Sequence, residues 1–118
     1  MKRILPFAAL LLSLCSTANA ANYATCLLDK LPGVQNDATA YAAAQLCTSK
    51  HPERYDSIAQ GSGRGLFSYE SGAECALDKG ADTLSSSAAG QIRVACNRLY
   101  NKQCSNLASE FGLNCQPN

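Results

Sequence analysis

The sequence has few of the residues from which large cores and metal centres are usually built. Its 118 residues include no Trp, one Met, three Phe and one His. A core with so few large aromatic side chains buries little apolar area, and a small chain of this kind depends on cross-links for its stability. A single His disfavours the histidine-rich ligand sets of catalytic metal sites. The sequence therefore predicts neither a metal site nor a cofactor.

The sequence has no excess of positive or negative charge, and it has no long apolar run. Ten Lys and Arg stand against nine Asp and Glu. Nucleic-acid binding needs clustered basic residues, so we expect no nucleic-acid partner. The longest apolar run, from Ile4 to Leu14, has 11 residues. A helix that spans a bilayer needs about 20, so this run predicts no membrane span.

The first 20 residues have the pattern of a secretory signal peptide. Lys2 and Arg3 precede the apolar run, and the small residues Ala18-Asn19-Ala20 follow it. We therefore expect cleavage after Ala20 and export, with no stable membrane anchor afterwards. A lipoprotein signal with Cys15 as the lipidated residue is the alternative, although the bulky Leu14 before it disfavours that interpretation.

The cysteines also indicate an oxidising compartment. Without Cys15 an even number remains, which in a small exported chain predicts a disulfide framework. The six are Cys26, Cys47, Cys75, Cys96, Cys104 and Cys115. A structural zinc site is the alternative, but the cysteine pairs spaced by two to four residues that are typical of such sites are missing.

A stretch of 22 residues occurs twice, from Cys26 to Cys47 and from Cys75 to Cys96. The two copies share both cysteines, the sequence Leu-Asp-Lys at residues 28–30 and 77–79, and one alanine. These identities predict an internal duplication. Disulfide pairing within each copy then gives 26–47 and 75–96, which leaves 104–115 for the tail.

Each copy is predicted to form two helices joined by a turn. In the first copy, Tyr23 to Lys30 forms a helical run that Pro32 and Gly33 end. Asn36 or Asp37 can then cap a second helix over the alanine-rich residues 38–50. In the second copy, Gly80 ends the first run, and one of the serines 85–87 caps a helix that extends to Tyr100. Four residues of that helix share an apolar face: Ala88, Ile92, Cys96 and Leu99.

The fold class predicted from this pattern is all-α, because no alternating polar and apolar pattern of useful length predicts a strand. We expect one small domain, residues 21–118, made of two disulfide-stapled helical hairpins plus short helices. The first repeat covers about residues 22–51 and the second about residues 69–102. A tail over residues 103–118, with a short helix at 105–111, completes the chain.

The segment between the repeats is expected to hold a short helix, Pro52 to Gln60, and then a flexible linker over residues 60–66. Three glycines fall within Gly61 to Gly65. A phosphate-binding loop is disfavoured, because it needs a preceding strand and a following Gly-Lys-Ser/Thr, and neither is present. Leu66 and the aromatic residues beyond it are expected to pack back onto the core. Because loops on rigid scaffolds often carry function, this segment is also the candidate interaction loop, with Arg64, Phe67 and Tyr69.

Candidate catalytic residues are scarce. His51, close behind Cys47 and Lys50, faintly resembles the catalytic His of secreted helical phospholipases. In those enzymes an acidic residue follows the His and a calcium loop precedes it, whereas here Pro52 follows and no such loop is present. The sequence therefore predicts no catalytic residue. The Asp-Lys pairs at 29–30 and 78–79 are interpreted as solvated positions, because adjacent residues do not face each other on a helix.

The spacing Cys…Pro-Gly-x-x-Asn-Asp…Cys resembles a segment of small exported bacterial proteins. It is carried by Cys26, Pro32, Gly33, Asn36, Asp37 and Cys47. The resemblance implies a bacterial source, hence the periplasm or the cell exterior, and implies no activity. The expected function is a non-enzymatic interaction or inhibitor-like module whose partner is another periplasmic or extracellular protein. The alternatives are a membrane-active helical toxin or effector and, less favoured, a small secreted hydrolase.

Overall fold

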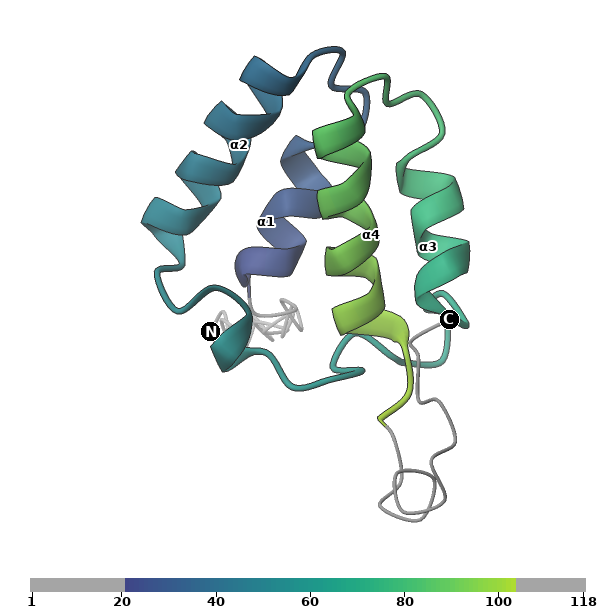
Figure 1. Ribbon diagram of the computed structural model, residues 1–118. Helices are drawn as coiled ribbons and strands as arrows, with labels where there is room; N and C mark the ends of the chain where they lie inside the picture. The colour runs from purple at the N-terminus through teal and green to yellow at the C-terminus, as the bar shows by residue number, and fades with distance from the viewer. Residues whose placement is uncertain (1–20, 104–118) are drawn as a thin grey trace, which may run out of the picture.

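The computed structural model describes residues 21–103, and every regular element in that part of the chain is a helix (Figure 1). In chain order they are α1 (Tyr23–Lys30), α2 (Asp37–Lys50), the 3₁₀ turn η1 (Arg54–Ser57), α3 (Gly72–Lys79) and α4 (Ser86–Tyr100). The predicted all-α class is confirmed for these residues. The expected signal peptide, the tail helix and the 104–115 pairing lie outside the described residues.

The duplication predicted from the sequence is visible in the helix boundaries. Each second-copy residue has a number 49 higher than its counterpart, as Cys75 has relative to Cys26. By this rule α1 maps onto α3 with the same bounds, and α2 maps onto α4 except for one residue at the C-terminal end. The two copies therefore form equivalent hairpins.

The helices begin at side-chain caps that occupy matching positions of the two copies. A cap side chain accepts a hydrogen bond from a backbone N–H three residues on, which satisfies a donor that the helix itself leaves free. The four bonds are Thr25 N to Asn22 (2.9 Å), Thr39 N to Asn36 (2.9 Å), Glu74 N to Ser71 (3.2 Å) and Ala88 N to Ser85 (3.0 Å). Of the alternatives left open by the sequence, Asn36 and Ser85 are the caps.

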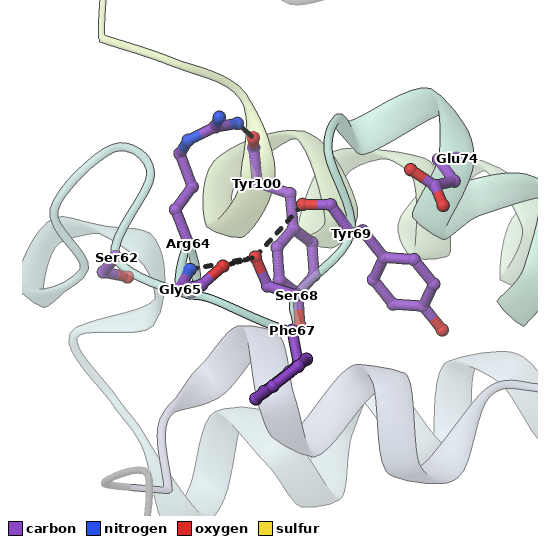
Figure 2. Close-up of a pocket in the computed structure, with 9 residues that line it drawn as sticks. Ser62, Arg64, Gly65, Phe67, Ser68, Tyr69, Glu74 and Tyr100 are labelled. Atoms are coloured by element: carbon purple, nitrogen blue, oxygen red, sulfur yellow. Dashed lines mark hydrogen bonds between the residues drawn. The ribbon is translucent and has the colours of Figure 1, made fainter.

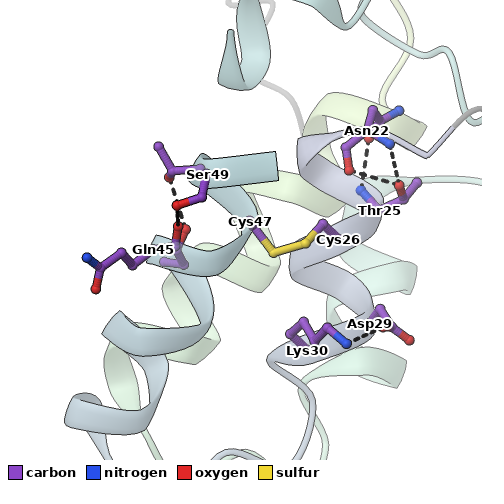
Figure 3. Close-up of a disulfide and its surroundings, with 10 residues drawn as sticks. Asn22, Thr25, Cys26, Asp29, Lys30, Gln45, Cys47 and Ser49 are labelled. Carbon is purple, nitrogen blue, oxygen red and sulfur yellow. Dashed lines mark hydrogen bonds and ion pairs between the residues drawn. A yellow bond between two sulfur atoms is a disulfide. The ribbon is translucent and has the colours of Figure 1, made fainter. Parts of the chain in front are cut away.

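Each hairpin is closed by a disulfide between its two helices, as the repeat predicts. Cys26 pairs with Cys47, with their Cα atoms 5.7 Å apart (Figure 3). Cys75 pairs with Cys96 at 5.6 Å. Both bonds join the middle of the first helix of the hairpin to the later part of the second, because antiparallel helices bring those positions side by side.

The core lies mainly between α1 and α4, which are central in the molecule, with α2 and α3 on the outside (Figure 1). Leu27 and Leu31 from the first repeat pack there with the apolar face of α4. All four residues predicted for that face are buried. The outer helices bury little: α2 buries only Ala40 and Cys47, and α3 only Gly72 and Cys75.

The two hairpins are also joined at their turns. The Gly33 N–H donates to Thr83 Oγ1 (2.9 Å), and the Ser85 N–H donates to the Val34 carbonyl (3.1 Å). Gly33 has a φ of +82°, the left-handed geometry expected of this turn. Asp37, the first residue of α2, accepts from the Ser85 hydroxyl at the start of α4. The two halves therefore share one core. The sequence predicted one domain but gave no indication of these contacts between the turns.

The helix expected over Pro52 to Gln60 is reduced to the four residues of η1, so this prediction is largely wrong. Arg54 has a φ of 53°, which an α-helix does not allow. The Arg98 side chain on α4 donates to the carbonyls of Tyr55 (3.0 Å) and Ile58 (2.8 Å). Long-range contacts to α4 thus replace the local bonds that a longer helix would make.

Candidate functional site

The glycine-rich segment 61–65 is anchored to the end of α4. The Gly61 N–H donates to the Arg98 carbonyl (2.8 Å), and the Gly63 N–H donates to the Leu99 carbonyl (2.9 Å). Gly63 also approaches α4 closely: a Cβ at this position would lie 2.9 Å from the Tyr100 ring. The segment predicted as a flexible linker is therefore hydrogen-bonded to α4. Its glycines allow close backbone contact with a helix end.

Arg64 takes part in the same anchoring. Its guanidinium donates to the carbonyls of Tyr100 (2.6 Å) and Glu70 (2.8 Å). Tyr100 is the last residue of α4, and the final carbonyls of a helix have no partner within the helix. A cation at this end also interacts favourably with the helix dipole. Arg64, predicted as the charge of an interaction loop, therefore has a structural role at the C-terminus of α4.

Replacing Arg64 with alanine is expected to lower the free energy of unfolding by about 1 kcal/mol, because two carbonyls lose a charged donor at an exposed site. Thermal or urea unfolding measures the change. Arg93→Ala is the matched control, since Arg93 is an exposed arginine on α4, the helix whose end Arg64 contacts. It should change stability by less than about 0.5 kcal/mol. Equal stability of the two variants would contradict the anchoring role.

The loop ends in a tight turn that exposes two large apolar side chains. The Ser68 N–H donates to the Gly65 carbonyl (3.3 Å), and the Ser68 hydroxyl accepts from the Gly65 N–H (2.9 Å). Leu66 and Phe67 occupy the two corners and are 91% and 97% exposed. The prediction that they pack back onto the core is wrong. Turn corners favour Gly, Pro, Asn and Asp, so the turn does not require Leu and Phe here. Core packing does not explain these two residues either, because both side chains are exposed.

Tyr69, the third predicted loop residue, does pack against the core. Its ring meets the Tyr100 ring edge to face, with centroids 5.1 Å apart. Its hydroxyl donates to an Asp78 carboxylate oxygen. That hydrogen bond, with smaller effects of burial and nearby carboxylates, raises the pKa of Tyr69 to about 12. Tyr69 therefore stays neutral, with a fixed ring.

The three predicted loop residues line one hollow of about 690 Å³ (Figure 2). Two residues that the sequence did not single out, Tyr100 and Glu74, also line it. Burial raises the pKa of Tyr100. In Figure 2 the Arg64 guanidinium lies at the carbonyl of Tyr100 and away from Glu74. The hollow thus combines aromatic rings with a carboxylate.

A second hollow, of about 530 Å³, brings together residues from both copies of the Leu-Asp-Lys motif. Its lining is Leu28, Asp29, Pro32, Gly33, Asp78, Lys79 and Asp82. Lys30 lies 3.3 Å from Asp29, an ion pair between exposed neighbours (Figure 3). Asp78, interpreted from the sequence as a solvated position, is exposed but also holds the Tyr69 hydroxyl. The sequence could not show that the two motifs converge, because convergence depends on how the hairpins pack.

The other candidate features occupy ordinary positions in the fold. His51 ends α2: its N–H donates to the Cys47 carbonyl, and its own carbonyl accepts from the Arg54 N–H. Between residues 21 and 103 no group of three or more His, Cys, Asp or Glu side chains is placed to hold a metal ion. No helix in that range has the length and apolar character that a membrane crossing requires.

Comparison with protein-family models, with curated proteins and with solved structures gives no match for this chain. The evidence for a function is therefore the geometry of the loop and of its hollow.

Proposed function

We propose that this protein is an exported, non-enzymatic binding module that docks a partner protein through the turn formed by residues 65–68. The observation that carries this proposal is the exposure of Leu66 and Phe67 on a turn whose backbone is hydrogen-bonded. Apolar side chains held in water cost solvation free energy in the free protein, and contact with a partner removes that cost.

The anchoring of the loop supports docking. Association normally loses entropy as loops and side chains become ordered. Here Gly61, Gly63 and Arg64 already attach the segment to α4 before any partner arrives. A large aromatic residue on such a preorganised turn has the properties of a binding hot spot.

The two disulfides within residues 21–103 are compatible with an oxidising compartment. With the signal-peptide pattern of residues 1–20, we place the protein in the bacterial periplasm or outside the cell, and its partner there too. The carboxylates beside the turn, Glu70, Glu74 and Asp78, favour a protein partner over an anionic lipid surface, because a membrane of that kind repels them.

Phe67→Ala is expected to weaken partner binding about tenfold or more, as truncation of a central aromatic anchor does. Stability should not change, because the ring is 97% exposed. The measurement is quantitative cross-linking to the partner captured from a periplasmic extract, followed by titration of that partner. Tyr41→Ala is the control, since Tyr41 is an exposed aromatic residue on α2 and does not line the hollow beside the turn.

Equal loss of binding in the two variants, or no loss in Phe67→Ala, would overturn the proposal. Vesicle leakage that depends on Phe67 would also overturn it, in favour of the membrane-active alternative.

A further inference from the structure

The hollow beside the docking turn has a distinctive chemical lining. The rings of Tyr69 and Tyr100, which pack edge to face, line it together with Phe67. Among the described residues that line it, Glu74 supplies the only carboxylate. One oxygen of Glu74 accepts the Glu70 N–H (2.9 Å), which fixes the group, and a carboxylate has capacity for several more donors. Fixed rings beside a fixed carboxylate can receive a cation.

The residues around the hollow leave that cation position open. Arg64, the only cationic residue in the part of the lining that lies within residues 21–103, is held by the carbonyls of Tyr100 and Glu70. The Tyr69 hydroxyl is already engaged with Asp78. A ligand would therefore meet the aromatic ring of Tyr69 and the carboxylate of Glu74.

We propose that this hollow receives an arginine side chain of the partner protein. A guanidinium group can stack on an aromatic ring and donate to a carboxylate at the same time, because it is planar and has donors along its edges. A lysine ammonium does both less well. The protein itself contains a contact between a guanidinium and a ring, since the Arg54 Cζ atom lies over the Tyr23 ring, 5.4 Å from its centroid. The inference rests on the proposed docking function and names the chemistry of the partner.

The surroundings favour a basic partner segment as well. The described lining of the second hollow has three carboxylates, those of Asp29, Asp78 and Asp82, and one cation, Lys79. Lys30, outside the lining, pairs with Asp29, so one negative charge remains in excess. Asp78 connects the two hollows, because it holds the hydroxyl of Tyr69. Basic residues that flank the bound arginine would therefore meet a negative potential, which raises the rate of association.

The test uses the secreted form of the full chain and three short synthetic peptides. Each peptide has a leucine, for contact with Phe67, next to an arginine, a lysine or a citrulline, which has the shape of arginine without its charge. Titrations are followed by the ring-proton signals of Tyr69 and Tyr100. We expect the arginine peptide to bind most tightly and the citrulline peptide about tenfold or more weakly.

Glu74→Gln should weaken the arginine peptide about threefold while keeping the acceptor for the Glu70 N–H. Glu53→Gln, which removes an exposed carboxylate on the segment before η1, should leave binding unchanged. Equal binding of the arginine and citrulline peptides, or no effect of Glu74→Gln, would overturn the arginine assignment. If Phe67→Ala still weakens partner capture in that case, the docking function stands and only the chemistry of the partner is wrong.

Discussion

Replacing both Cys26 and Cys47 with alanine is expected to lower the free energy of unfolding by about 3 kcal/mol. In the chain-entropy model, a cross-link stabilises by restricting the unfolded chain, and a loop of this length contributes about that much. The two cysteines are 21 positions apart in the sequence. Cys47 is also fully buried, so its replacement by alanine leaves unfilled space in addition.

The loss of stability should be concentrated in α2. This helix buries only Ala40 and Cys47, while Tyr41 and Leu46 on it are 63% and 44% exposed. Few apolar contacts therefore remain to hold α2 once the disulfide is absent. The core between α1 and α4 also contains Leu27, Leu31 and Ile92, so we expect its packing to persist without this bond. We expect α2 to open in a local transition at lower free energy than the rest of the fold.

Urea unfolding gives the total change, and amide hydrogen exchange locates it. Residues 37–50 should lose protection first, while α4 keeps most of its own. The counterpart with alanine at Cys75 and Cys96 serves as the comparison, because it should release α3 instead of α2. Uniform loss of protection across all helices in both variants would show that the disulfides stabilise the fold as a whole and do not attach its outer helices.

The fold was predictable because its signals are local and occur twice. Asn36 and Ser85 cap equivalent helices, and Gly33 and Gly80 follow equivalent helix ends. Each of these features acts within a few residues along the chain. The matched cysteines then fixed which helices pair, which composition alone does not determine. Local rules and the repeat pointed to one arrangement, and the structure has it in residues 21–103.

The interaction loop was only partly predictable, because its geometry depends on contacts across the chain. Three glycines in five residues indicate flexibility when only neighbours are considered. The hydrogen bonds from Gly61 and Gly63 to α4 join residues more than 30 positions apart. Similarly, the apolar character of Leu66 and Phe67 predicts that they are buried, because the sequence does not show which apolar side chains stay exposed to solvent. The aromatic hollow also depends on Tyr100, and no sequence pattern indicates that Tyr100 lies near Tyr69.

Gly72→Ala is expected to cost about 3 kcal/mol, at the upper end of what overpacking usually costs. Gly72 begins α3 and lies close to Asn97 on α4. A Cβ there would lie 2.2 Å from Asn97 Oδ1, 2.7 Å from its Cα and 2.9 Å from its backbone nitrogen. Two of these atoms belong to the backbone of α4, so no side-chain rotation relieves the overlap. The Gly72 N–H also donates to Asn101 Oδ1 (2.8 Å), and displacement of α3 would break that bond.

Gly90→Ala makes the same chemical change in the middle of α4 and should have the opposite sign. A Cβ on Gly90 meets nothing within 4 Å. Alanine in an exposed helical position is favoured over glycine by about 1 kcal/mol, so this variant should be more stable than the parent. Thermal unfolding of the two variants beside the parent measures both effects. If Gly72→Ala also stabilised the protein, α3 and α4 would not be in the close contact that joins the second hairpin, and the hollow built on α3 and the end of α4 would lose its support.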